Sequence, residues 1–159
     1  MKTKTEQVCS CSCGTVKFNI VGLPLFRILC HCTICQRFNK AAYGDVVVYD
    51  AASVELPPNG AVSFDTYKPP PNIQRGKCVR CNEPAIERVE IPLMPKLIII
   101  PKSVHGPEAK LPSPMAHIFY DKRVADMMDE LPKYQGFVSS QCAFGKYLLK
   151  AKLSKNKPT

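Results

Sequence analysis

The sequence predicts a mainly β protein of short antiparallel sheets with one or two short helices. Fifteen prolines and eight glycines divide the 159 residues into short segments, and most of these show the apolar pattern of strands. Eight of the nine cysteines lie in three tight clusters, at spacings that suit a shared metal ion better than disulfides between neighbours. We therefore expect the sheets to be organised around zinc sites.

Strand patterns recur along most of the chain. In residues 15–21, Val16, Phe18 and Ile20 alternate with polar residues, as in a strand with one buried face. Residues 97–100 are all apolar, which is typical of a strand buried on both faces. Further strands are expected over 26–29, 43–49, 53–56, 61–67, 86–91 and 115–120, with a loop at Pro69-Pro70-Pro71.

Helical patterns are fewer than strand patterns. Residues 34–39 have room for one or two turns of helix. Residues 122–131 place apolar side chains at helical spacing and are followed by Pro132, which would end the helix. A further helical segment is predicted over 145–153.

Length and composition fit one domain with a real core, since 45% of the residues are hydrophobic. No apolar run approaches the ~20 residues that a membrane-spanning helix needs. The first residues lack the hydrophobic segment of a secretion signal. We therefore expect a soluble, cytoplasmic protein without a membrane partner, in which clustered cysteines serve as metal ligands or catalysts.

The net charge of +9 is concentrated at the C-terminus, where residues 131–159 hold six lysines and no acidic residue. We therefore divide the chain into a zinc-binding domain, 1–135, and a basic tail, 136–159. The tail is interpreted as a solvated, partly frayed end; the alternative is an electrostatic contact with nucleic acid or an acidic partner. Few aromatic residues accompany these lysines, so stacking on bases has little support.

The first and third cysteine clusters predict one closed metal site. Cys11 and Cys13 lead into a strand, where residues two apart share a face, and Cys78 and Cys81 have the two-residue gap of a metal-binding turn. Together they offer the four thiolates of a structural zinc site. Cys9 extends the first cluster as a competing ligand or a spare thiol, but the glycine after Cys13 favours Cys11 and Cys13.

The middle cluster, Cys30, Cys32 and Cys35, predicts a second metal site. Three thiolates leave an open position, which is what a catalytic zinc requires. His31 points to the opposite face of an extended chain, so a structural or supporting role is expected for it. The alternative is a second structural site completed by Cys9, Cys142 or a histidine.

Other candidates for chemistry are few. His117 lies in the apolar run 115–120 and is interpreted as a core or edge histidine, whereas His105 lies in a turn and is expected to face solvent. The sequence has no defensible pair of catalytic carboxylates. It also has neither a P-loop nor a glycine-rich dinucleotide motif, so these nucleotide-binding classes are excluded.

The cysteine motifs resemble those of the family of glutathione-dependent formaldehyde-activating enzymes and centromere protein V. The matching runs are CSCGTVKF at 11–18, CHCTICQR at 30–37 and CVRC at 78–81, with a weaker match at 114–118. Asn82 replaces the family's usual glycine after the last pair, but asparagine tolerates the positive φ that the turn needs. The resemblance implies a mainly β fold and two zinc ions. The structural zinc would be held by Cys11, Cys13, Cys78 and Cys81, and the catalytic zinc by Cys30, Cys32 and Cys35.

The resemblance also implies carbon–sulfur lyase chemistry, in which formaldehyde is joined to the thiol of glutathione to give S-hydroxymethylglutathione. We therefore expect an enzyme that adds a small, glutathione-like thiol to formaldehyde or a related aldehyde. Arg37 and Lys40 are candidates for holding a carboxylate of that thiol. The alternative is a zinc-stabilised binding module whose basic tail contacts nucleic acid or an acidic protein; the three-thiol cluster favours the enzyme.

Overall fold

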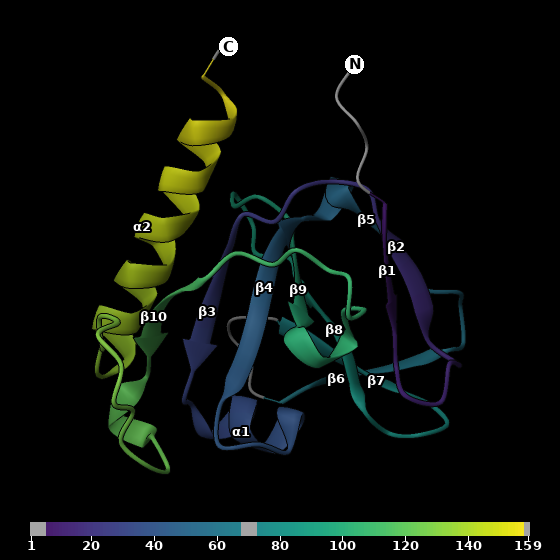
Figure 1. The fold of residues 1–159 in the computed structure, drawn as a ribbon, viewed down its shortest axis with the longest axis horizontal. Coiled ribbons are helices and arrows are strands. Elements are labelled where there is room, and N and C mark those ends of the chain that lie inside the picture. The colour runs from purple at the N-terminus through teal and green to yellow at the C-terminus, as the bar shows by residue number, and fades with distance from the viewer. Residues whose placement is uncertain (1–5, 68–72, 158–159) are drawn as a thin grey trace.

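The computed structural model describes residues 6–67 and 73–157, which form two sheets and two helices (Figure 1). The small sheet has the order β1-β2-β5, and the large sheet has the order β10-β3-β4-β9-β8-β7-β6. This arrangement confirms the predicted mainly β fold. The bounds are β1 Gln7–Ser10, β2 Lys17–Ile20, β3 Phe26–Cys30, β4 Gly44–Asp50, β5 Val54–Glu55, β6 Val62–Thr66, β7 Ile73–Cys78, β8 Pro84–Val89, β9 Leu97–Pro101, β10 Pro114–Ile118, α1 Thr33–Asn39 and α2 Phe137–Lys155.

The large sheet has a core on each face, and its two central strands supply both. Along β4, Val47 and Tyr49 face the small sheet, whereas Val46 and Val48 face the helices; the apolar run of β9 divides in the same way. Adjacent strands of the large sheet are antiparallel, except that β10 runs parallel to β3. Burial on both faces explains why these strands are continuous apolar runs.

Every predicted strand overlaps an observed one, but β1 and β7 were not predicted. The middle of β7 reads Gln74-Arg75-Gly76-Lys77, which has no apolar alternation. Its side chain at position 75 is nevertheless buried, because it pairs with a carboxylate on β8. The loop predicted at Pro69-Pro70-Pro71 lies outside the described residues.

The helices correct two predictions. α1 agrees with the pattern at 34–39, but the helix predicted over 122–131 is wrong. The apolar residues that suggested it do not form a buried stripe: Val124 and Met128 are 66% and 95% exposed. This segment instead enters a polar network, in which the Met127 N–H donates to the Tyr120 hydroxyl at 2.8 Å.

The C-terminal segment is a helix docked on the sheet rather than a frayed, solvated end. α2 begins eight residues before the predicted start at 145 and lies beside β10 and β3 (Figure 1). It buries Ala143, Tyr147 and Leu148, and Phe144 meets Phe26 of β3 edge-on, with ring centroids 5.1 Å apart. The division of the chain at residues 135 and 136 stays a prediction. Neither helix among the described residues has the length and apolar character needed to cross a bilayer.

Candidate metal centres

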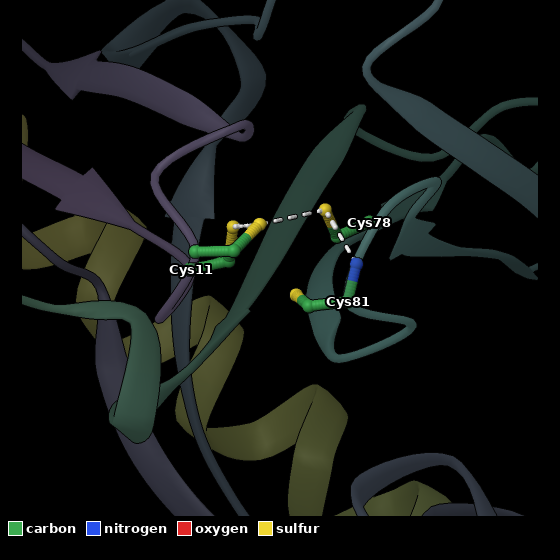
Figure 2. Close-up of side chains that lie close together, drawn as sticks. Cys11, Cys78 and Cys81 are labelled. Carbon is green, nitrogen blue, oxygen red and sulfur yellow. Dashed lines mark hydrogen bonds between the residues drawn. The ribbon is translucent and has the colours of Figure 1, made fainter.

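Four cysteines from two distant parts of the chain meet at one point. Cys11 and Cys13 lie in the turn between β1 and β2, and Cys78 and Cys81 lie where β7 turns towards β8 (Figure 2). Their four sulfur atoms all lie within 4.8 Å of one another. The Sγ atom of Cys13 is 3.5 Å from that of Cys11 and 3.7 Å from that of Cys78.

Backbone N–H groups already point at these sulfurs. The N–H of Val16 donates to Cys11 Sγ at 3.3 Å, and those of Arg80 and Cys81 approach Cys78 Sγ at 3.4 and 3.5 Å. Such donors favour the thiolate over the thiol. A hydrogen bond with the Thr15 hydroxyl likewise lowers the pKa of Cys13 to about 6. Four converging sulfurs with this support fit a closed, structural zinc site.

Two residues with positive φ shape the turns that carry these sulfurs. Gly14 has φ +76°, and its N–H closes the first turn on the carbonyl of Cys11 at 3.1 Å. Asn82 has φ +58°, and its N–H donates to the carbonyl of Cys78 at 2.9 Å. The expectation that asparagine would preserve this turn is therefore confirmed.

The three remaining clustered cysteines also converge. Cys30 ends β3, Cys32 precedes α1 and caps its first turn by accepting the Cys35 N–H at 3.3 Å, and Cys35 lies in that turn. Their sulfurs lie within 4.8 Å of one another. Hydrogen bonds from the thiols of Cys30 and Cys35 lower the pKa of Cys32 to about 3, so a thiolate is favoured there. The set fits a three-thiolate zinc site with a position left for another ligand.

Neither Cys9 nor Cys142 belongs to these two sulfur groups. Cys9 is fully buried in the core between the sheets, where burial raises its pKa to about 12. Cys142 is exposed on α2. The geometry therefore gives no support to a second structural site completed by either thiol.

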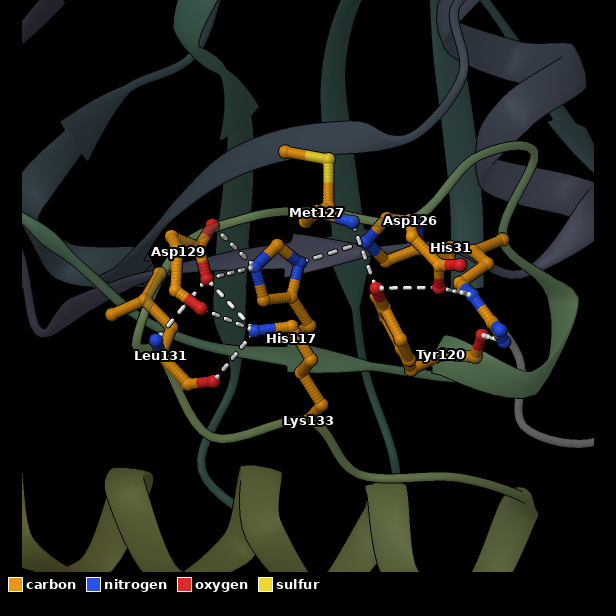
Figure 3. A network of polar contacts seen from close by, with 9 residues as sticks. His31, His117, Tyr120, Asp126, Met127, Asp129, Leu131 and Lys133 are labelled. Atoms are coloured by element: carbon orange, nitrogen blue, oxygen red, sulfur yellow. Dashed lines mark hydrogen bonds and ion pairs between the residues drawn. The ribbon is translucent and has the colours of Figure 1, made fainter.

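A chain of hydrogen bonds runs from the buried His31 through the buried His117 to Asp129 at the surface (Figure 3). The Nε2 atom of His31 is 2.8 Å from Nδ1 of His117, and the Nε2 atom of His117 is 2.9 Å from a carboxylate oxygen of Asp129. Because the carboxylate can only accept, His117 donates through Nε2, and in the neutral ring Nδ1 is left to accept from His31. Burial lowers the pKa of His31 to about 4, so this ring is neutral at neutral pH.

Backbone hydrogen bonds also hold His31 in place between Cys30 and Cys32. The His31 N–H donates to the carbonyl of Ile118 at 3.0 Å, and the Gln36 amide donates to the His31 carbonyl at 2.7 Å. These bonds fix the backbone at His31, which agrees with the structural or supporting role expected for it. Sequence reasoning missed Asp129, because it lies in the segment that was expected to be helical.

The other two histidine predictions have different outcomes. His117 is fully buried, which confirms a core histidine. The expectation that His105 faces solvent is wrong, since its Nε2 atom lies 3.0 Å from the Tyr49 hydroxyl and its ring stacks on that tyrosine. Burial accordingly lowers the pKa of His105.

A buried ion pair faces the same side of the large sheet as the three-cysteine group. Arg75 on β7 and Glu87 on β8 are paired across the strands, with Nε and Oε2 3.0 Å apart, and both are almost fully buried. Burial raises the pKa of Glu87 to about 7, while the charge of Arg75 opposes that rise. Arg37 and Lys40, which the sequence offered as candidates for holding a carboxylate of the thiol, are not part of this ion pair. Arg37 is exposed, and Lys40 donates to the carbonyl of Asn82.

The fold and its sulfur groups define a small, mainly β protein with two sets of cysteines able to bind metal. Residues 6–122 match the model of the family described as glutathione-dependent formaldehyde-activating enzyme, and the chain belongs to that family. The match includes all seven converging cysteines and ends before Asp129 and α2. No curated protein sequence matches the chain.

Proposed function

We propose that this protein is a zinc-dependent carbon–sulfur lyase that adds a small, glutathione-like thiol to formaldehyde or a related aldehyde. The observation that carries the proposal is that three sulfurs converge, those of Cys30, Cys32 and Cys35. Among the described residues, no fourth cysteine joins this group. Membership of the formaldehyde-activating family supports the choice of substrates.

Under this proposal the two sulfur groups have different tasks. Cys11, Cys13, Cys78 and Cys81 hold a structural zinc, and Cys30, Cys32 and Cys35 hold the catalytic one. When bound at the second site, zinc offers a position for one more ligand and keeps a thiol there deprotonated at neutral pH. The chain's own residues orient the site: the Cys35 N–H supports the Cys32 sulfur, and His31 fixes the backbone beneath it.

The overall reaction is a simple addition. The substrate sulfur bonds to the aldehyde carbon, the carbon–oxygen π bond breaks, and the proton lost by the thiol ends on that oxygen. Holding the two reactants together lowers the activation free energy of the addition substantially, because a bimolecular step becomes effectively unimolecular.

The binding-module alternative has less support. Two of the lysines that suggested it, Lys152 and Lys155, form ion pairs with Asp50 and help to fasten α2 to the body of the protein. Their charges are therefore partly neutralised within the chain.

The test compares Cys32→Ser with Cys142→Ser in zinc-loaded protein. We expect Cys32→Ser to reduce thiol-dependent formaldehyde consumption to the uncatalysed rate while the circular dichroism spectrum stays unchanged. Cys142→Ser should keep the full rate, because that thiol is exposed and outside both groups. The proposal fails if wild-type protein shows no thiol-dependent consumption, or if Cys32→Ser keeps the rate.

A further inference from the structure

Two cations on β7 lie on the face of the large sheet that carries the three-cysteine group. Arg75 and Lys77 are two residues apart on one strand, which places their side chains on a common face. The row across the sheet runs from Arg75 to Glu87 and on to Ile99, a residue of the core that also contains Cys30 and Cys35. Arg75 is 7% exposed, and Lys77 is only partly buried.

Aromatic rings join these cations to α1. The Nζ atom of Lys77 lies 5.9 Å from the ring centroid of Phe38 and 5.8 Å from that of Tyr67, and the Arg75 guanidinium carbon lies 5.9 Å from the Tyr67 ring. Phe38 is three residues after Cys35, so both lie on one face of the helix.

The hydrogen-bonding capacity of Arg75 is not used up by Glu87. Its Nε atom is 3.0 Å from the Glu87 carboxylate, but it is buried without a properly aligned acceptor in the described part of the chain. A guanidinium has five N–H donors, and leaving buried donors without acceptors is costly. The Nε donor is enclosed beside Glu87, so the two Nη groups of the fork are the donors that a further anion would meet.

We propose that Arg75 and Lys77 bind a carboxylate of the thiol substrate, so that the three-cysteine site prefers thiols that carry a carboxylate over neutral thiols. The identity of this ligand rests on the proposed function. Arginine offers a planar fork of donors that matches a carboxylate, and Lys77 adds a second, more accessible positive charge. Phe38 and Tyr67 line the same cations, so the bound group would be partly shielded from water.

A competing explanation is that Arg75 only balances the negative charge of the three thiolates. That role would affect all ligands of the site equally and would not involve Lys77. The two explanations therefore differ in whether the effect depends on the ligand's carboxylates and on the lysine.

The experiment measures binding of S-methylglutathione and of its diethyl ester to the zinc-loaded protein by calorimetry. The variants are Lys77→Met and Arg75→Lys, with Lys17→Met as the matched control, because it removes the same charge from an exposed site on the small sheet. Lys77→Met should weaken S-methylglutathione binding about threefold to fivefold, which is the effect of one partly exposed ion pair. Arg75→Lys should weaken it about tenfold, because the forked contact is lost.

The diethyl ester should bind more weakly than the acid to the wild type and should be insensitive to all three substitutions. Lys17→Met should bind both ligands like the wild type. The proposal is overturned if the ester binds as tightly as the acid, or if Lys77→Met behaves like Lys17→Met. Should Arg75→Lys fail to fold, the lysine variant alone decides the matter.

S-methylglutathione has no free thiol, so its binding separates this inference from the proposed function. If S-methylglutathione binding depends on Lys77 but the protein adds no thiol to aldehyde, the carboxylate contact is supported and the enzyme proposal is wrong. If the protein adds neutral and carboxylate-bearing thiols to aldehyde equally well, the carboxylate contact is contradicted and the enzyme proposal is supported.

Discussion

At the scale of single residues, the surroundings of each sulfur decide what a cysteine does. Cys32 accepts hydrogen bonds from neighbouring thiols and from a backbone N–H, and its pKa falls to about 3. Cys9 is surrounded by the apolar core, and its pKa rises to about 12. Spacing alone left Cys9 as either a ligand or a spare thiol, because two-residue steps do not reveal which sulfurs a turn will bring together.

Cys9 should behave as a buried, inert thiol. At pH 8 a thiol with a pKa of about 12 is a thiolate in only about one molecule in ten thousand, so iodoacetamide should spare it and label the exposed Cys142. Peptide mass spectrometry of the folded protein measures both. Cys9→Ala should keep the full zinc content and reduce the free energy of unfolding by about 1 kcal/mol, the cost of a small cavity. A drop in zinc content in that variant would show that Cys9 is a ligand after all.

The histidine chain should contribute to stability through its buried donor. His117→Phe keeps an aromatic ring in place but leaves the Nε2–H group of His31 without its acceptor. A buried donor without a partner costs about 1–3 kcal/mol, so we expect the free energy of unfolding in urea to fall by that amount. Asp129→Asn serves as the control, because its amide oxygen can still accept from His117 and the loss should be smaller. Equal losses in the two variants would contradict this reading of the chain.

At the scale of elements, the sequence predicted best where one physical effect dominates. The apolar runs of β4 and β9 and the alternation of β2 are set by burial, and each was found. β7 was missed because its buried position holds Arg75, whose charge is compensated by a residue on the next strand. The end of α2 was recognised, but its first two turns were not, since Phe137 and Val138 are exposed and give no amphipathic signal.

The three-cysteine group could be recognised from sequence, but its support could not. The supporting residues form hydrogen bonds or ion pairs with partners on other strands or loops, and only the fold reveals these pairs. They are His117, Asp129, Arg75 and Glu87. Chemistry that depends on neighbours in sequence, such as the Cys30–Cys35 motif, is therefore predicted more readily than chemistry that depends on neighbours across a sheet.

The contact between α1 and β4 should determine whether the three sulfurs meet. A Cβ atom added at Gly44 would lie 3.3 Å from Cβ of Cys35 and 2.9 Å from the side-chain nitrogen of Asn39. Gly44→Ala should therefore push α1 outward and move Cys35 away from Cys30. We expect loss of about one zinc per chain in this variant, measured by elemental analysis, with the other zinc retained.

Gly145→Ala is the matched control for that substitution. Nothing lies within 4 Å of a Cβ atom added at Gly145, which is in the middle of α2. Alanine there should stabilise the protein by about 0.5–1 kcal/mol, because glycine is a poor helix former, and the zinc content should not change. Two zinc ions per chain in Gly44→Ala would show that the site tolerates a displaced helix.

At the scale of the whole molecule, the two sulfur groups differ in what they hold together. The group of Cys11, Cys13, Cys78 and Cys81 joins the small sheet to the end of β7, across 65 residues of sequence between Cys13 and Cys78. The group of Cys30, Cys32 and Cys35 joins only the end of β3 to the start of α1. A metal at the first group restrains the chain over long range, so its binding is coupled to folding far more strongly.

This difference predicts two separate stages of metal loss. Cys32→Ser should lose one zinc and keep the far-ultraviolet circular dichroism spectrum and a melting temperature close to that of the wild type. Cys13→Ser should melt at a much lower temperature or fail to fold, because the four-sulfur site is broken and the two sheets are no longer tied. Cys142→Ser controls for the loss of a thiol as such. If Cys32→Ser destabilised the protein as much as Cys13→Ser does, the three-cysteine group would be a second structural site, and the division of labour between the two groups would be wrong.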